Sequence, residues 1–138
     1  MNSGTDDVMF IVWERRGRLA ADVKTALVGI PAKVVVVDDE TEFRETLAES
    51  RSTVAILGRA TVGEWLPDAI VAADLSHSRI IVVGTANADE MRRDLDLGAH
   101  LLIQESPVGF QWSATIRRLA KASQNDVRTA RAFSRHRR

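Results

Sequence analysis

The chain has 138 residues, of which 45% are apolar, so we expect one globular domain with a single core. Its 19 acidic and 19 basic side chains give a net charge of zero, which argues against broad electrostatic capture of nucleic acid. Cysteine is absent, which excludes disulfides, thiolate catalysis and cysteine-ligated zinc. No apolar run approaches the ~20 residues that span a bilayer, and the polar, acidic start of the chain does not suit a secretory signal, so we expect a cytoplasmic protein.

Five short apolar runs rich in Val and Ile recur along the chain, and each is followed by a segment with helical spacing. Runs of this kind, without polar alternation, are typical of strands that are buried on both faces of a parallel sheet. Strand–helix alternation predicts an α/β fold with right-handed crossovers. The five predicted strands are Val8–Trp13, Val34–Val37, Val54–Leu57, Ile80–Val83 and Leu101–Ile103.

Acidic residues and a proline mark the starts of two of the predicted helices. Asp38, Asp39 and Glu40 follow the second run, where acids favour the positive end of a helix, and Thr41 is the expected N-cap. The same acids are an alternative site for a divalent cation. Pro67 is expected in the first turn of a helix that runs on to residue 75, because proline is tolerated there.

The helix after the fourth run has the clearest signals at both of its ends. Asn87 and Glu90 have the spacing of a capping box at its start. Met91 and Leu95, four residues apart, predict its inward face. Gly98 is the expected residue just past its end.

The second half of the sequence resembles a response-regulator receiver domain. The residues that carry the resemblance are a strand that ends at Thr85-Ala86, a helix, the Gly98-Ala99 corner, a further strand and Pro107. The resemblance implies a flavodoxin-like (βα)5 sandwich over residues 8–123, with sheet order 2-1-3-4-5 and a site at the C-terminal strand ends. In an alternative alignment the acidic pair at 38–39 follows the first strand. We favour the alignment that starts at residue 8, because the other omits one βα unit.

Receivers carry an aspartate after the third strand, and here Gly58 and Arg59 stand in its place. The resemblance identifies a degenerate phosphorylation pocket made of Trp13, Glu14, Gly58, Arg59, Thr85 and Glu105. At most one metal-binding acid survives, and the lysine that would contact the phosphoryl group is missing. We therefore predict no catalytic residue, no metal and no cofactor. Arg15, Arg59 and Glu105 are predicted to form a salt-bridge cluster in its place.

These observations predict a phosphorylation-independent pseudo-receiver that is not an enzyme and acts as a protein-interaction module in signal transduction or transcriptional regulation. The expected partner is a second copy, bound through the fourth and fifth helices, with no membrane partner. The candidate surface residues are Arg92, Trp112, Arg117 and Arg118.

Two other functions remain open. One is a small-ligand or metal-binding domain that uses the strand-end crevice, with Asp38, Asp39 or Thr85 as contacts. The other is a nucleic-acid-binding regulator that acts through the basic end of the chain. Residues 1–7 are predicted to be a flexible N-terminus, and residues 124–138 a tail or truncated linker. The anion-binding candidates in that tail are Arg128, Arg131, Arg135, Arg137 and Arg138.

Overall fold

The computed structural model describes residues 8–15, 18–49, 53–104 and 113–123. Five parallel strands form one sheet with the order β2-β1-β3-β4-β5, as predicted. The strands are β1 (Val8–Trp13), β2 (Ala32–Val37), β3 (Thr53–Gly58), β4 (Arg79–Val83) and β5 (Leu101–Ile103). The helices are α1 (Arg18–Ala26), α2 (Glu40–Glu49), α3 (Arg59–Val62), the 3-10 helix η2 (Gly63–Trp65), α4 (Leu66–Leu75) and α5 (Ala88–Leu97), and residues 113–123 are also helical.

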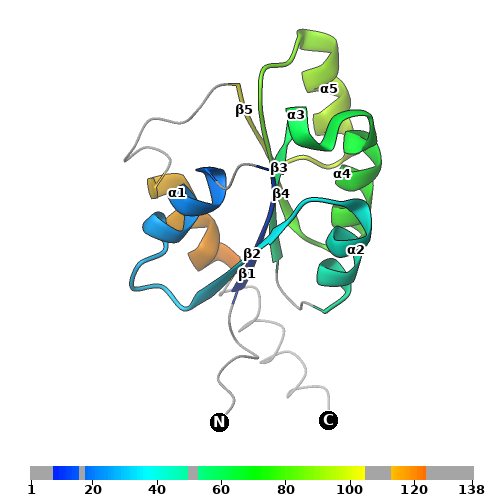
Figure 1. The fold of residues 1–138 in the computed structure, drawn as a ribbon. Helices are drawn as coiled ribbons and strands as arrows, with labels where there is room; N and C mark the ends of the chain where they lie inside the picture. Colours follow the sequence, from blue (N-terminus) through cyan, green and yellow to red (C-terminus); the bar gives the residue numbers. More distant parts are fainter. Residues whose placement is uncertain (1–7, 16–17, 50–52, 105–112, 124–138) are drawn as a thin grey trace, which may run out of the picture.

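Helices cover both faces of the sheet (Figure 1). One core cluster lies between the sheet and α1 with residues 113–123, and the other between the sheet and α2 with α4. All of β3 and nearly all of β1 are buried, whereas the edge strands β2 and β5 are more exposed. This pattern explains the continuous apolar runs of the central strands. None of the described helices has the length and apolar character that crossing a membrane requires.

The helix boundaries confirm most of the sequence signals. Pro67 lies in the first turn of α4. Asn87 accepts a hydrogen bond from the backbone N–H of Glu90, and the Glu90 carboxylate accepts one from Asn87 in return, so the capping box is complete. Gly98 ends α5 with φ of 127°, in the left-handed region that favours glycine.

Two local predictions were wrong. Thr41 lies inside α2, and Asp39 is the residue that caps this helix, because its Oδ1 accepts a hydrogen bond from the N–H of Glu42 at 2.8 Å. On α5, Leu95 is 51% exposed whereas Asp94 is fully buried. A prediction from hydrophobic pattern alone places leucine inward. It cannot predict a buried acid whose charge is paired with a cation.

Candidate functional site

A pocket of about 550 Å³ opens at the C-terminal ends of β1, β3 and β4. Parallel α/β sheets bind ligands in this crevice, at the point where the strand order reverses, which here lies between β1 and β3. Three segments form it: the β1–α1 connection, the junction of β3 with α3, and the end of β4. The lining residues are Glu14, Arg15, Arg18, Leu19, Gly58, Arg59, Ala60, Thr61, Val83 and Gly84.

Gly58 is the last residue of β3 and is buried. A Cβ atom at this position would lie 3.1 Å from the carbonyl oxygen of Trp13 and 3.7 Å from the Thr61 hydroxyl oxygen. The carbonyl belongs to the backbone of the neighbouring strand, so it has little freedom to retreat. Close packing of β1 against β3 therefore accounts for the glycine, and Gly58 itself supplies no nucleophilic side chain at this strand end.

Among the described residues that line the crevice, Glu14 is the acid, and backbone N–H groups of α1 bind its carboxylate. The side chain is 6% exposed. Its Oε2 accepts a hydrogen bond from the N–H of Leu19 at 2.8 Å, and its Oε1 accepts one from the N–H of Ala20 at 3.2 Å. Both donors lie in the first turn of α1, where N–H groups lack partners within the helix. Glu14 therefore caps α1, and the positive end of the helix stabilises its charge.

Trp13 lies outside the pocket, in the core between the sheet and α2. Its ring centroid is 5.0 Å from that of Phe43 and 5.3 Å from that of Trp65. The guanidinium of Arg44 covers the outer ring, with its carbon 5.1 Å from the Trp65 centroid. An aromatic cluster thus occupies a strand end where the resemblance implies a metal-binding acid.

Arg59 is held by a buried carboxylate on α5. Its Nη2 lies 2.6 Å from Oδ2 of Asp94, which is fully buried, while the arginine side chain is 13% exposed. Arg93 donates to the other oxygen, Oδ1, at 3.2 Å. The predicted partner, Glu105, lies outside the described residues, and Arg15 is exposed at the pocket. The acid that pairs with Arg59 is therefore Asp94, which the sequence did not single out.

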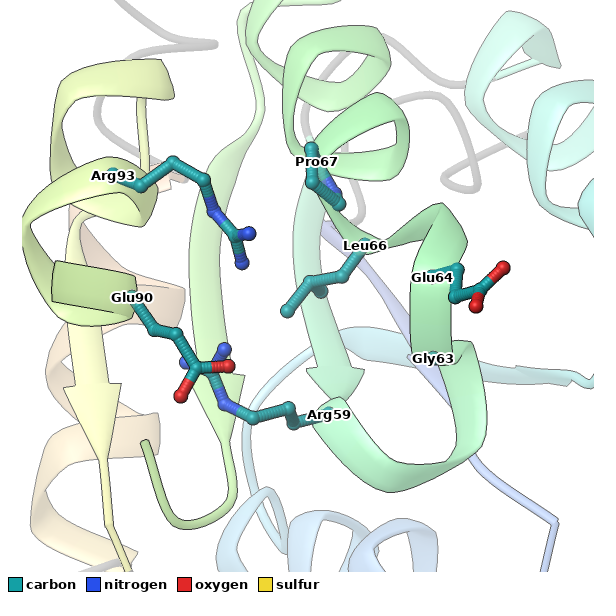
Figure 2. Close-up of a pocket in the computed structure, with 7 residues that line it drawn as sticks. All are labelled: Arg59, Gly63, Glu64, Leu66, Pro67, Glu90 and Arg93. Atoms are coloured by element: carbon teal, nitrogen blue, oxygen red, sulfur yellow. The ribbon is translucent and has the colours of Figure 1, made fainter. Parts of the chain in front are cut away.

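A second pocket, of about 500 Å³, lies between α5 and the segment that runs from α3 to α4. Figure 2 shows Arg59 reaching from α3 toward α5 and Arg93 reaching from α5 toward α4, while the Glu64 carboxylate points away. Arg59 also lines the strand-end pocket, so this residue borders both spaces. Nε and Nη1 of this arginine are buried and have no hydrogen-bond partner in the part of the chain that the structure describes.

Thr85 lies in the connection between β4 and α5, where its side chain hydrogen-bonds to the backbone just after β5. Its hydroxyl donates to the carbonyl oxygen of Gln104 at 3.3 Å. The Gln104 side chain accepts from the N–H of Ala86 at 2.8 Å and donates to its carbonyl oxygen at 3.3 Å. The N–H of Gly84 donates to the carbonyl oxygen of Ile103 at 2.8 Å. These bonds tie the connection to the end of β5.

The residues predicted to form an interaction surface are not equivalent. Arg92 on α5 and Arg118 in the last described helix are exposed. Arg117 is exposed as well, but its guanidinium donates to the carbonyl oxygens of Ala26 and Val28 at 3.2 and 3.1 Å, so it binds the C-terminal end of α1. Trp112 and the arginines at 128, 131, 135, 137 and 138 lie outside the described residues.

The acids at the start of α2 form an exposed group rather than a pocket. Oxygens of Asp38, Asp39 and Glu42 lie within 4.8 Å of one another. Asp39 already caps α2 through the N–H of Glu42. None of the three lines the strand-end crevice, and neither does Thr85.

The fold is that of receiver domains. No protein-family model matches the chain, and no curated protein matches its sequence. A response regulator from Thermotoga maritima superposes with a TM-score of 0.69 at 16% identity, over 83% of this chain and 98% of that one. The signal receiver domain of the putative response regulator NarL from Mycobacterium tuberculosis gives a TM-score of 0.64 at 15% identity, over 83% of this chain and 97% of that one. At such low identities the likeness establishes the fold alone.

Proposed function

We propose that this chain is a phosphorylation-independent pseudo-receiver, a non-enzymatic protein-interaction module of signal transduction or transcriptional regulation in the cytoplasm. The likeness of its fold to receiver domains supports the signalling role. The end of β3 carries the argument against phosphorylation, because Gly58 offers no carboxylate there and is packed against the Trp13 carbonyl.

The residues around the crevice do not fit the metal that phosphoryl transfer to a carboxylate requires. Formation of an aspartyl-phosphate needs a carboxylate nucleophile, and Mg²⁺ needs oxygen ligands in a near-octahedral arrangement. The carboxylate of Glu14 is engaged by two backbone N–H groups of α1, and Trp13 belongs to the core. The rim of the crevice carries arginines instead, which repel a divalent cation.

Incubation with acetyl phosphate and Mg²⁺, followed by intact-mass measurement, tests this proposal. We expect the mass to stay unchanged, while a receiver domain that retains its aspartate gains one phosphoryl group under the same conditions. A phosphate-sized gain on this chain that hydroxylamine removes, as it removes an acyl phosphate, would contradict the proposal.

The proposed interaction is a homodimer through α5 and the helix at residues 113–123. An exposed leucine, Leu95, and the neighbouring Arg92 on α5 support this face. Sedimentation equilibrium at tens of micromolar protein should give a dimer. Leu95→Arg should shift it to monomer, and Leu75→Arg, at a still more exposed leucine on α4, should not. A monomeric wild-type chain, or equal effects of the two variants, would exclude this face.

A further inference from the structure

The outer edge of β2 is an open strand edge in the part of the chain that the structure describes. β2 is the first strand in the sheet order, so only its inner edge is paired, with β1. Apart from that ladder, the backbone of residues 33–37 makes no hydrogen bond among the described residues. A row of free N–H and C=O groups of this kind is a template for a further strand.

Valines follow one another along this edge, and the helices cover them incompletely. Val36 is 42% exposed and belongs to neither core cluster, while Val34 and Val35 are half-buried. The strand contains no proline or glycine that would interrupt pairing. An exposed apolar edge tends to pair with another chain unless charged side chains prevent it, and here the charges stand near its two ends.

The two ends of β2 carry opposite charges. Lys33, near the start, is exposed and forms no ion pair among the described residues. The acidic group beyond the end of the strand consists of Asp38, Asp39 and Glu42, whose oxygens lie within 4.8 Å of one another. No basic side chain in the described part of the chain pairs with these three acids, so their mutual repulsion is not offset.

We propose that β2 pairs with β2 of a second copy of the chain, antiparallel and across a two-fold axis. Two identical edges can meet in the parallel or the antiparallel direction, and the charges distinguish the two. In the parallel direction equal ends meet, so lysine would face lysine and the acidic groups would face each other. In the antiparallel direction Lys33 of each copy approaches the acidic group of the other, and the symmetry makes this contact twice.

One register pairs residues 33–37 of both copies, and it places Val35 opposite Val35 of the second copy. Val36 then lies opposite Val34 of the second copy, on the same face of the joined sheet. Side chains directly opposite each other in an antiparallel pair are in contact, so the exposed Val36 gains an apolar neighbour.

The same register also brings the opposite charges together. Lys33 lies opposite Val37 of the second copy and one diagonal step from its Asp39. Long side chains span such a diagonal. The Oδ1 atom of Asp39 caps α2, which leaves Oδ2 for the lysine. Hydrogen bonding, apolar contact and charge therefore favour the same arrangement.

Sedimentation equilibrium from about 20 µM to about 1 mM tests the pairing in the Leu95→Arg background, where the proposed α5 contact is removed. An edge contact is small, so we expect monomer at the low concentration and dimer at the high one. Lys33→Glu sets acid against acid and should weaken this dimer at least about tenfold. Arg92→Glu makes the same change of charge on α5 and should leave it unchanged. The parent chain, which keeps both contacts, should form species larger than a dimer at about 1 mM.

Cross-linking tests the register, because the chain has no cysteine and one introduced thiol defines the contact. In the same background and with a short bismaleimide, Val35→Cys should cross-link to its own copy faster than Leu75→Cys. The order is informative because Leu75 is 75% exposed and Val35 is only half-buried. Exposure alone therefore predicts the opposite result.

Lys33 is exposed, so Lys33→Glu should keep the thermal stability of its parent. The proposal is overturned if the Leu95→Arg chain is monomeric at about 1 mM, if Lys33→Glu associates as strongly as its parent, or if Leu75→Cys cross-links as fast as Val35→Cys. The α5 face is tested by the dimer at tens of micromolar and by its response to Leu95→Arg alone. The two interfaces therefore fail separately.

Discussion

Asp94→Asn should be among the most destabilising conservative changes in this domain. The substitution keeps the size of the side chain but leaves Arg59, which is 13% exposed, facing a neutral amide. Removal of one partner from a fully buried ion pair costs about 3–5 kcal/mol. Because Arg59 retains some contact with solvent, we expect the free energy of unfolding to fall by about 2–3 kcal/mol, somewhat less than that range.

Urea unfolding followed by far-UV circular dichroism measures this loss. For a domain of this size the free energy of unfolding falls by about 1–3 kcal/mol per molar urea, so the midpoint should move down by about 1–2 M. Arg93→Met is the matched control. Its side chain is 45% exposed and contacts the same carboxylate, so its removal should cost no more than about 1 kcal/mol.

A double-mutant cycle isolates the ion pair from the effects of packing. The single variant Arg59→Met should itself destabilise the domain, since it leaves Asp94 with one partner, the exposed Arg93. The double variant Arg59→Met/Asp94→Asn should then lose at least about 1 kcal/mol less than the sum of the two single losses. Additive losses, or a midpoint shift below about 0.3 M for Asp94→Asn, would refute the reasoning.

Two further changes test the connection between β4 and α5. Gly84→Ala should lower the free energy of unfolding by about 1–3 kcal/mol, because φ is +140° and the new Cβ would lie 2.8 Å from Cβ of Arg59. Gly63→Ala, with φ of +64° and no atom within 4 Å, should cost less in the same thermal melts, and a reversed order would contradict the packing argument. Gln104→Ala should accelerate hydrogen exchange of the Ala86 amide, whose acceptor it removes; unchanged exchange would show that the side chain does not hold this loop.

The sequence predicted the sheet well because central parallel strands are apolar on both faces. The predicted runs at residues 8–13 and 101–103 coincide with β1 and β5, and the other three strands extend at most two residues beyond their predictions. The first residues of two strands, Ala32 in β2 and Thr53 in β3, were not predicted. Small and hydroxyl side chains are common in loops as well, so they do not mark the start of a strand. The capping box at Asn87 was predictable because it is a local hydrogen-bond pattern.

The site was less predictable because its contacts join residues that are distant in sequence. Arg59 and Asp94 are 35 residues apart, and only the fold brings them together. The sequence reasoning placed Glu14 correctly at the end of β1, but it treated this residue as what is left of a metal site. The structure shows that α1, which begins four residues later, binds the Glu14 carboxylate through the N–H of Leu19. The polar contacts of this site are made by charged residues, and hydrophobic periodicity does not identify the partners of such residues.

The aromatic cluster at the end of β1 limits which substitutions this strand end can accept. Trp13 is 4% exposed, and its ring packs at a tilt against those of Phe43 and Trp65. Replacing a buried tryptophan by a small residue costs about 3–5 kcal/mol, and a carboxylate there would be buried in addition. That loss is a large share of the ~5–15 kcal/mol by which domains are stable. An acid can therefore enter position 13 only after the surrounding rings have been repacked, so no single substitution leads from this sequence to a metal-binding strand end.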